Sequence, residues 1–584
     1  MSAQRRGERF SWLEGAAFAA LVGLVLAIGG ETLRTSYHGL MHATLGETVL
    51  RDGLLPENPY HAGEPLRYYT LYPLLGSLLG RLGIGTLWGF ALLAMIAALL
   101  FPPALDRLGR AFGLGFVGRR AAFLSAFFGF NGLGWLGLAF LEGSFTFGDS
   151  PAALLARLTF VAPDSTLGFD GRLLPLVAKF LNVSSYAIAL PFALWFLARV
   201  ADATRDVRVS PWPAAPALGL SVALNPLVGG FAAICGALWI APLLLRGTED
   251  VAGSRSLRFA WPLAGVLSAA VALPFLVPLL QPAATGESLQ TLGEIHGHPL
   301  RNLLGPLLLL WVPGALGLAR LAPHWRWRIG VGVVIAATFV LARRMPWANE
   351  YKFVRLLGVL LAIPVGAWIE HAWLRGRGTR ALLIGLWLVT LPSTVVVLAT
   401  YLRWERAPLP IVLDAGRMAI APESSAPGIG SRILEAARVA DPSDVFLVHP
   451  YVSGFAPGPE GILESRAVLP LSHGHPLAPL LNRPLAVDLP HFQNNRLPGY
   501  VRRVDRCVAL WHGHSSPLSP ERRAIPARRA LQKLREEVSG RGLLVLTSSD
   551  LPPIDGLLRS AGGELLVQES RFALWRVPPL ATEG

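Results

Sequence analysis

Long apolar stretches alternate with short, arginine-rich polar segments along the first 400 residues of the chain. A helix needs about 20 apolar residues to cross the hydrocarbon core of a membrane. Many windows satisfy this requirement, such as "FAWPLAGVLSAAVALPFLVPLL" from Phe259 and "TRALLIGLWLVTLPSTVVVLAT" from Thr379. The alternating ten-residue segments of an outer-membrane barrel are missing. The pattern therefore predicts a mainly α-helical, polytopic membrane protein.

The arginine clusters indicate how many times the chain crosses. Successive crossings alternate sides, and short loops rich in Lys and Arg face the cytoplasm. Placing every such loop inside predicts about eleven transmembrane helices. They lie near residues 11–30, 85–104, 121–141, 176–199, 213–227, 229–246, 259–281, 301–320, 329–343, 353–373 and 381–402. The basic N-terminus then reads as the cytoplasmic flank of an uncleaved signal anchor.

Two apolar segments depart from simple spans. If residues 69–83, "YTLYPLLGSLLGRLG", crossed the membrane, the basic loop after residue 104 would move outside, so we predict an interfacial or re-entrant helix there. In "NPLVGG", residues 225–230, the proline and the two glycines interrupt a long apolar run. They favour a hairpin of two short helices.

The pattern changes at about residue 403, where polar loops and shorter periodic segments begin. Helix-like "RRALQKLREEVSG" precedes strand-like "GLLVLTSSD", and "GELLVQES" with "RFALWRVPP" has the pattern of a hairpin. We predict a transmembrane domain over 1–402, with outer loop 31–84, and an extracytoplasmic α/β domain over 403–584. This second domain has no Gly-rich phosphate loop and no nucleophile elbow, which favours a binding or shaping role.

Composition supports this division. The chain is 52% hydrophobic and only 15% charged, which excludes an ordinary soluble protein. Its net charge of +14 comes from arginines between apolar segments, so it indicates cytoplasmic loops and not a nucleic-acid surface. The two cysteines, Cys235 and Cys507, lie far apart in an apolar and a polar region, which rules out a disulfide framework.

The first outer loop is where candidate chemistry gathers. A helix running to about Arg51 and stopped by Gly53 would place His38 and His42 one turn apart on one face. That spacing suits a pair of metal ligands, although the glutamate of a zinc-protease helix is missing between them. Three prolines then stiffen an extended, hairpin-like segment before Tyr68 and Tyr69.

The order of a first span, an outer helix with histidines, "LRDGLLPENPYHAGEPLRYY" and a short apolar helix resembles the first outer loop of GT-C-type glycosyltransferases. The later segments "VAKFLNVSSYAIAL", "LNPLVGG" and "NEYKFVRLLGVLLAIPVG" agree with this resemblance, which covers roughly residues 10–405. It implies a GT-C-like arrangement of helices. It also implies transfer of a hexosyl or pentosyl group from a polyprenyl-phosphate-linked donor at the outer face of the membrane. Richness in alanine, arginine and glycine suggests a GC-rich bacterial genome, and together with the topology this indicates a bacterial inner membrane.

The chain departs from that family at one position. Such enzymes carry an acidic residue just after the first span, where this chain reads "RTSYHG". Candidates for the base or a metal ligand are therefore Asp52, Glu57 and His38, and a divalent cation, Mg or Mn, is the cofactor such a site could use. The alternatives are that Asp52 only ends a helix and that Glu57 is a solvated turn residue. Asp164 and Asp170 could complete an acidic site.

Departure of a phosphate anion requires fixed positive charge. Arg67, Lys179, Lys352 and Arg355 fall at the outer ends of predicted spans, where a charge in an apolar segment favours function. The alternative for the lysines is that they extend to the lipid headgroups. Tyr68 and Tyr69 could line a sugar or isoprenoid groove. The sequence "HGHPL" occurs twice, at 296–300 and 473–477, which we attribute to coincidence.

Three function classes remain open on the sequence alone. The first is a glycosyltransferase whose partners are a lipid-linked sugar donor and membrane lipids. The second is a lipid or solute transporter or flippase, which would place charges in the middle of spans or show related halves. The third is a non-catalytic membrane scaffold with a GT-C-like fold. The sugar, the acceptor and any protein partner are not encoded in a readable motif.

Overall fold

The residues that the computed structural model describes make up most of the chain. They are residues 3–30, 39–140, 158, 173–205, 209–245, 254–281, 299–342, 349–402, 411–414, 417–420, 431–449, 455–457, 463–465, 483–487, 498–515, 523–538, 540–549, 551–569 and 572–580. By contact they form two compact units. The first unit comprises 1–33, 91–274 and 291–406, and the second comprises 34–90, 275–290 and 407–584.

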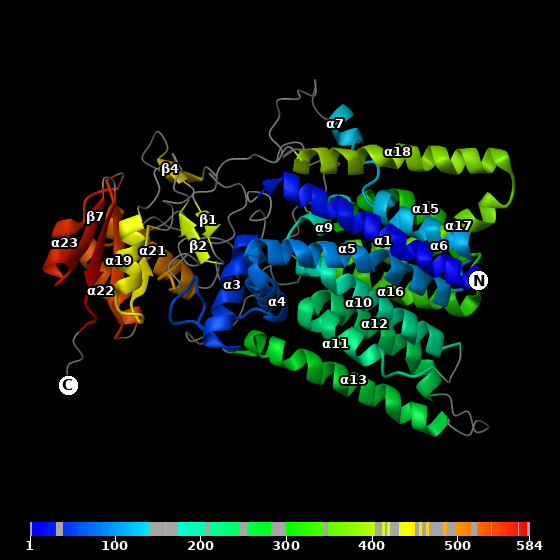
Figure 1. Cartoon of the computed structure of the whole chain (residues 1–584), viewed down its shortest axis with the longest axis horizontal. Helices are drawn as coiled ribbons and strands as arrows, with labels where there is room; N and C mark the ends of the chain where they lie inside the picture. Colours follow the sequence, from blue (N-terminus) through cyan, green and yellow to red (C-terminus); the bar gives the residue numbers. More distant parts are fainter. Residues whose placement is uncertain are drawn as a thin grey trace. The chain divides into compact units, whose positions relative to one another are not determined.

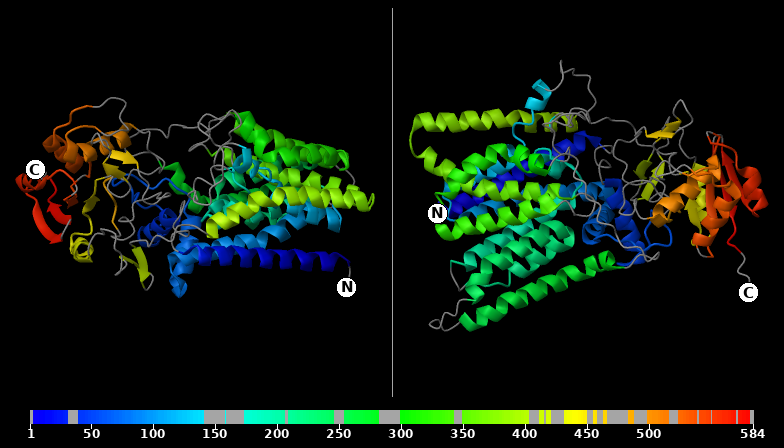
Figure 2. Two further views of the ribbon diagram at one scale, coloured as in Figure 1. Left: turned by 90° about the horizontal axis from the view of Figure 1, so that it is seen from above. Right: turned by 180° about the vertical axis from the view of Figure 1, so that it is seen from behind.

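Long apolar helices dominate the first unit and confirm an integral membrane protein. Among the described residues, nine helical segments are long and apolar enough to cross a membrane. They belong to α1 (Ala3–Ile28), α5 (Thr86–Ala111), α10 (Ser185–Ala203), α12 (Pro226–Leu245), α13 (Ser254–Leu276, continuing as η3, Val277–Leu280), α14 (Pro299–Leu304) with η4 (Gly305–Leu307) and α15 (Leu308–Leu318), α16 (Pro323–Ala342), α17 (Tyr351–Trp373) and α18 (Arg377–Leu402). The long helices run alongside one another in the views of Figures 1 and 2.

The other two predicted spans differ from single long helices. The region predicted as 121–141 contains α6 (Phe116–Leu124), η2 (Ser125–Gly129) and α7 (Leu136–Phe140). Asn131 breaks this run with a φ of +52°, and its backbone N–H donates to the carbonyl of Pro306 at 2.6 Å.

The predicted break in "NPLVGG" is confirmed at Asn225. It separates α11 (Ala214–Leu224), which has only 11 residues, from α12, which begins at Pro226 and has 20. Asn225 Oδ1 accepts a hydrogen bond from the backbone N–H of Val228 at 3.3 Å, and Pro226 occupies the first helical position, which it suits. A Cβ on Gly229 would lie 2.4 Å from Val222 atoms, so this glycine lets the two helices pack closely. Helix α12 is longer than predicted, because it includes both glycines of "NPLVGG".

Helix α17 is the most buried of the long helices, with 83% of its apolar window inside the protein. It packs against α6, α15 and α16. A Cβ on Gly317 of α15 would lie 1.7 Å from the carbonyl oxygen of Pro364, so the α15 and α17 backbones touch there. Small residues at helix contacts are the usual means of close packing in membranes. Side chains that point inward from α17 are therefore held in a fixed position.

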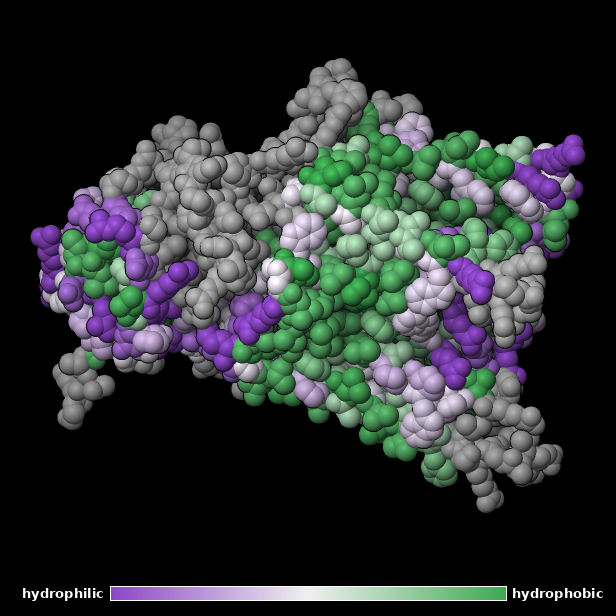
Figure 3. All heavy atoms as spheres, viewed as in Figure 1, coloured by the Kyte–Doolittle hydropathy of each residue, from purple (hydrophilic) through white to green (hydrophobic). Residues whose placement is uncertain are grey.

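Hydrophobic residues cover much of the face of the helical unit that Figure 3 shows. Examples with more than half of their surface exposed are Phe259 on α13, Val334 on α16 and Leu382 and Leu388 on α18. An apolar surface of this extent is stable only against lipid. Arginines gather at the bundle end where α5 and α10 finish and α6, α16 and α18 begin. We refer to it as the arginine-rich end.

The second unit contains the predicted α/β structure. Its main sheet has strand order β3-β6-β8-β7, made by β3 (Val445–Leu447), β6 (Leu543–Ser548), β8 (Phe572–Val577) and β7 (Glu564–Glu569). The predicted hairpin is confirmed, because β7 and β8 pair antiparallel. The helices are α19 (Ser431–Val439), α21 (Pro498–His512), α22 (Ala527–Glu537) and α23 (Asp555–Ser560), and two further strand pairs are β1 (Ile411–Asp414) with β2 (Arg417–Ile420) and β4 (Phe455–Pro457) with β5 (Leu463–Ser465).

The first outer loop belongs to this second unit. It contains α3 (Gly39–Asp52), which ends where predicted because Gly53 has a φ of +86°. The prolines then form the predicted hairpin-like segment, in which Asn58 N–H donates to the Glu64 carbonyl at 2.8 Å. The segment 69–83 forms α4 (Leu71–Leu79) and η1 (Gly80–Ile84), an apolar helix too short to be among the long ones.

The tip of that loop is part of the hydrophobic core of the C-terminal region. Ala62 is fully buried among core residues of α21 and β6. Its N–H donates to the carbonyl of Leu485, and the N–H of Leu485 donates to the carbonyl of Pro59, both at 2.9 Å. Arg503 of α21 donates to the carbonyl of Ala62. The loop therefore adds an extended segment to a domain that lies more than 400 residues later in the sequence.

A buried histidine makes this unit sensitive to acid. His449 is fully buried, its ring centroid lies 5.2 Å from that of Trp511, and burial, with a smaller contribution from His512, lowers its pKa to about 3. Between pH 6.5 and 3 the unfolded chain binds a proton at this residue that the folded chain does not. His449 therefore costs no free energy of unfolding above pH 6.5, and the free energy of unfolding falls as the pH decreases below that value. At pH 5 the loss from this residue is about 2 kcal/mol.

We expect His449→Gln to reduce the loss of folding stability at low pH. The measurement is thermal unfolding of the second unit at pH 7.5 and pH 5 for both proteins. Unfolding is detected by limited proteolysis within 498–580. Equal losses of stability in wild type and variant would contradict the assignment.

Candidate functional site

The candidate site in the first unit is built at the end of the bundle opposite the arginine-rich end. Helix α9 (Val177–Leu181) carries Lys179 and stops at Asn182, whose backbone is extended. Helix α10 then starts with Ser184 as its N-cap, since the Ser184 hydroxyl accepts a hydrogen bond from the N–H of Tyr186 at 3.3 Å. Helix α17 begins at Tyr351, so Tyr351, Lys352 and Arg355 lie in its first turns.

Two of the predicted cations meet at one aromatic ring. Lys179 Nζ lies 5.0 Å from the centroid of Tyr351, and Arg355 Cζ lies 6.0 Å from the same centroid. Arg355 also lies 5.6 Å from the ring of Phe130. Both distances are within the range of cation–π attraction. Lys352 neighbours Tyr351 in the sequence and is half-buried.

Arg355 is only 1% exposed. A charge buried between apolar helices is expensive and is kept where it binds something. Lys179 is half-buried and so can approach a ligand from outside the bundle. The two side chains present positive charge at one end of the membrane unit, which is the property that a phosphate-binding site requires. We call Lys179, Tyr351 and Arg355 the cation cluster.

Sequence reasoning missed the polar residues around this cluster. The hydroxyl of Tyr401, near the end of α18, donates to Oδ1 of Asn182, and both residues are buried. Asn225 Nδ2 donates to the hydroxyl of Ser185 at 3.0 Å. Tyr351 and Asn182 lie within segments that carried the GT-C resemblance, and this was the available signal. Tyr401 had none, because it ends an apolar helix like many interfacial tyrosines.

In the second unit, Arg67 forms a buried ion pair. Its Nη2 lies 3.7 Å from Glu64 Oε2, and the two side chains are 3% and 6% exposed. Burial lowers the pKa of Arg67, and Glu64 partly opposes this effect. The Nε and Nη2 atoms are buried and make no hydrogen bond to any residue that the structure describes. Glu64 was not predicted, because the segment "EPLR" is not helical and an i,i+3 spacing indicates a pair only on a helix.

Tyr68 and Tyr69 form a packed aromatic pair in this unit. Their rings stack with centroids 4.1 Å apart, the hydroxyl of Tyr68 donates to that of Tyr69 at 2.8 Å, and both residues are buried. That these two side chains line a sugar or isoprenoid groove stays a prediction. Stacking of adjacent rings is possible because the backbone here is irregular and lies between the hairpin and α4.

The two predicted carboxylates differ in their surroundings. Asp52 ends α3, is exposed, and forms an ion pair with the neighbouring Arg51 at 2.6 Å. Glu57 Oε1 accepts from Arg541 Nη1 at 2.6 Å and from the backbone N–H of Gly63. Glu57 therefore joins the outer loop to the C-terminal region, whereas Asp52 is open to solvent.

The described residues do not assemble a metal site. No group of three or more His, Cys, Asp or Glu side chains is arranged to hold a metal ion in the part of the chain that the structure describes. His42 is buried among aromatic rings, with its centroid 4.8 Å from that of Tyr72. His38, Asp164, Asp170 and the two "HGHPL" sequences fall outside the described residues.

Comparisons with known proteins identify the fold. The chain is similar to the structure of arabinofuranosyltransferase AftD from Mycobacteria, with a TM-score of 0.59 and 17% identity over 98% of this chain and 42% of that one. It therefore spans about two fifths of the AftD chain. ArnT from Cupriavidus metallidurans, bound to undecaprenyl phosphate, gives a TM-score of 0.45 and 12% identity over 96% of this chain and 98% of its own.

The oligosaccharyltransferase of Archaeoglobus fulgidus gives a TM-score of 0.34 and 12% identity, covering 92% of this chain and 69% of that one. No protein-family model and no curated protein sequence matches the chain. The likeness to AftD confirms the predicted GT-C-like fold. At this identity it shows the arrangement of the helices and not the reaction.

Proposed function

We propose that this protein is a membrane glycosyltransferase that moves a sugar from a polyprenyl-phosphate-linked donor to an acceptor at the outer face of a bacterial inner membrane. The observation that carries the proposal is the cation cluster, in which Lys179 and Arg355 flank Tyr351 at one end of a GT-C-like bundle. Transfer assays with different donors and acceptors would identify the sugar and the acceptor.

The chemistry follows from the leaving group. When the bond between the sugar carbon and the phosphate oxygen breaks, negative charge develops on the phosphate. Fixed positive charges at that point stabilise the transition state more than the ground state. The neighbouring ring of Tyr351 holds both side chains in place, which reduces the reorganisation needed. Arg355 and Lys179 are thus assigned to the donor phosphate.

The acceptor hydroxyl needs a base. We assign this role to Asp52 and not to Glu57, because Glu57 already accepts hydrogen bonds from Arg541 and Gly63. A carboxylate that is exposed and shares only a surface ion pair can exchange its partner at small cost. Glu57 is assigned to positioning the outer loop. His38 remains a second candidate for the base.

We expect Asp52→Asn to lower turnover by about 100-fold or more, because general-base catalysis typically contributes 10²- to 10⁴-fold. Glu57→Gln removes one half-exposed ion pair and is expected to lower turnover less than tenfold. The assay follows transfer of labelled sugar from polyprenyl-phosphate sugar into envelope acceptors, using purified protein in micelles. Full activity in Asp52→Asn would refute the base assignment.

The orientation is also part of the proposal. Arginine-rich ends of membrane bundles face the cytoplasm, which puts the N-terminus inside and the cation cluster outside. We expect an impermeant maleimide to label Ser560→Cys in intact spheroplasts, and to label Arg326→Cys only after permeabilisation. The native cysteines, Cys235 and Cys507, are buried and give a low background. Labelling of both positions from outside would contradict this orientation.

A further inference from the structure

A cavity of about 370 Å³ lies at the arginine-rich end of the first unit, away from the cation cluster. Its walls include Trp12 of α1, Arg107 and Arg110 of α5, and Trp195 and Arg199 of α10. Three guanidinium groups and two indoles around one cavity form an unusual set for a simple packing defect, since empty cavities in proteins are normally apolar. None of these residues takes part in the proposed transfer reaction.

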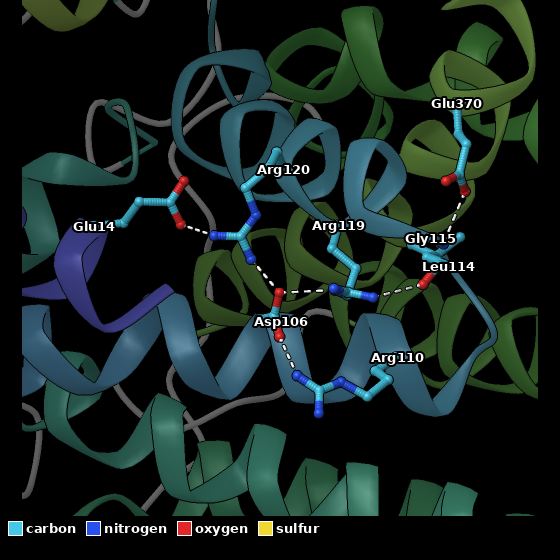
Figure 4. A network of polar contacts seen from close by, with 8 residues as sticks. All are labelled: Glu14, Asp106, Arg110, Leu114, Gly115, Arg119, Arg120 and Glu370. Atoms are coloured by element: carbon cyan, nitrogen blue, oxygen red, sulfur yellow. Dashed lines mark hydrogen bonds and ion pairs between the residues drawn. The ribbon is translucent and has the colours of Figure 1, made fainter. Parts of the chain in front are cut away.

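An ion-pair network, drawn in Figure 4, reaches this cavity through Asp106 and Arg110. Asp106, whose side chain is 1% exposed, accepts from Arg110 at 2.9 Å, from Arg119 at 2.9 Å and from Arg120. Arg120 also pairs with Glu14. Among the described residues the network thus joins three guanidinium groups to two carboxylates, and Asp106 and Arg110 place part of it on the cavity wall.

Arg107 and Arg199 line the same cavity with different partners. Arg107 pairs with Asp202, so that contact is neutral overall. Arg199 donates from Nη2 to the backbone carbonyl of Ser210 at 2.9 Å, and a carbonyl does not neutralise its charge. The Nε–H of Arg199 is buried and has no hydrogen-bond partner in the described part of the chain. Among the residues that the structure describes, Arg199 thus gives the walls a positive charge without a carboxylate beside it and a donor without an acceptor.

The cavity lies at the level where the apolar helices end. Trp12 is in the first turn of the apolar segment that begins at Arg9, and Arg107 and Arg199 are in the last turns of the segments that finish at Ala111 and Ala203. Tryptophan side chains prefer the interface between water and hydrocarbon. A ligand in this cavity would therefore meet both lipid chains and the aqueous surface.

We propose that this cavity binds the phosphodiester headgroup of an anionic membrane phospholipid. A phosphodiester carries one negative charge and accepts hydrogen bonds at two free oxygens, which matches the positive charge and the Nε–H of Arg199. Basic pockets between helices at a cytoplasmic surface suit such headgroups. The indole N–H groups of Trp12 and Trp195 can donate to the ester and glycerol oxygens.

Native mass spectrometry tests this site. Protein purified in neutral detergent is mixed with equal amounts of phosphatidylglycerol and phosphatidylcholine, and the retained lipids are counted. We expect wild type to retain phosphatidylglycerol preferentially. In Arg199→Gln the ratio of bound phosphatidylglycerol to bound phosphatidylcholine should fall about fivefold, which is the effect of one basic residue near a lipid phosphate. Ala217→Phe, which fills the cavity without removing a charge, should have the same effect.

Arg326→Gln is the matched control. Arg326 lies at the same end of the bundle, hydrogen-bonds the carbonyls of Leu321 and Ala319, and does not line the cavity. The lipid preference of the Arg326→Gln variant should equal that of wild type. Unchanged thermal unfolding of all variants shows that they are folded. Wild-type preference in both Arg199→Gln and Ala217→Phe overturns the proposal. So does displacement of phosphatidylglycerol by about 10 mM inorganic phosphate, which would assign the cavity to a soluble phosphate ligand.

Discussion

Replacement of Arg355 by glutamine is expected to lower the rate of sugar transfer by about 100-fold, the effect of removing one preorganised donor to a developing oxyanion. Arg355 is 1% exposed and is held between the rings of Tyr351 and Phe130. Water cannot easily replace a guanidinium in that position. Glutamine has a similar reach and keeps a hydrogen-bond donor, so the loss reports mainly the missing charge.

The kinetic pattern separates a catalytic from a structural role. We expect kcat to fall much more than KM rises, because the charge acts on phosphate that becomes more negative in the transition state. Lys179→Arg should retain most activity, whereas Lys179→Gln should not. Arg301→Gln is the control, since Arg301 is a basic residue near the start of α14 at the same end of the bundle. Loss of activity through a rise in KM alone would contradict the assignment to the leaving phosphate.

Arg503→Ala is expected to destabilise the second unit by about 3 kcal/mol, because it leaves buried acceptors without their donor. Arg503 Nη1 donates to the carbonyls of Ala62 and Ala486, and its Nε pairs with Glu537 at 3.1 Å. Only 8% of this side chain is exposed. The outer loop and α21 lose their common hydrogen-bond centre when it is removed.

Proteolysis at increasing temperature measures this effect, with cleavage within 54–66 as the readout for release of the loop. Arg502→Ala is the control, because Arg502 is the exposed neighbour on the same helix. We expect Arg502→Ala to change stability by less than about 0.5 kcal/mol. Equal stability of the two variants would show that the loop does not depend on Arg503.

Elements with a local cause were predictable from the sequence. Gly53 ends α3 at its left-handed φ, Pro226 starts α12, and the alternation in β7 and β8 specified their hairpin. The break at Asn131 was missed because it depends on a distant partner, the carbonyl of Pro306. A long apolar run is predicted as one helix when the residue whose contact interrupts it lies far away in the sequence.

The candidate site shows the same limit. The cations Lys179 and Arg355 were predictable because charge within an apolar segment is costly and therefore informative. Their meeting at Tyr351 was not, because it joins residues more than 170 positions apart. Glu57 was predicted as a base, yet its partner Arg541 lies in the C-terminal region, and nothing in either local sequence indicates the pair.

The most direct measurement is a cryo-EM map of the protein with bound polyprenyl phosphate. We predict density for the phosphate within hydrogen-bond distance of Lys179 and Arg355, beside the ring of Tyr351, and loss of that density in Arg355→Gln. Phosphate density elsewhere on the protein, with Lys179 and Arg355 making no contact to it, would contradict the proposed donor site.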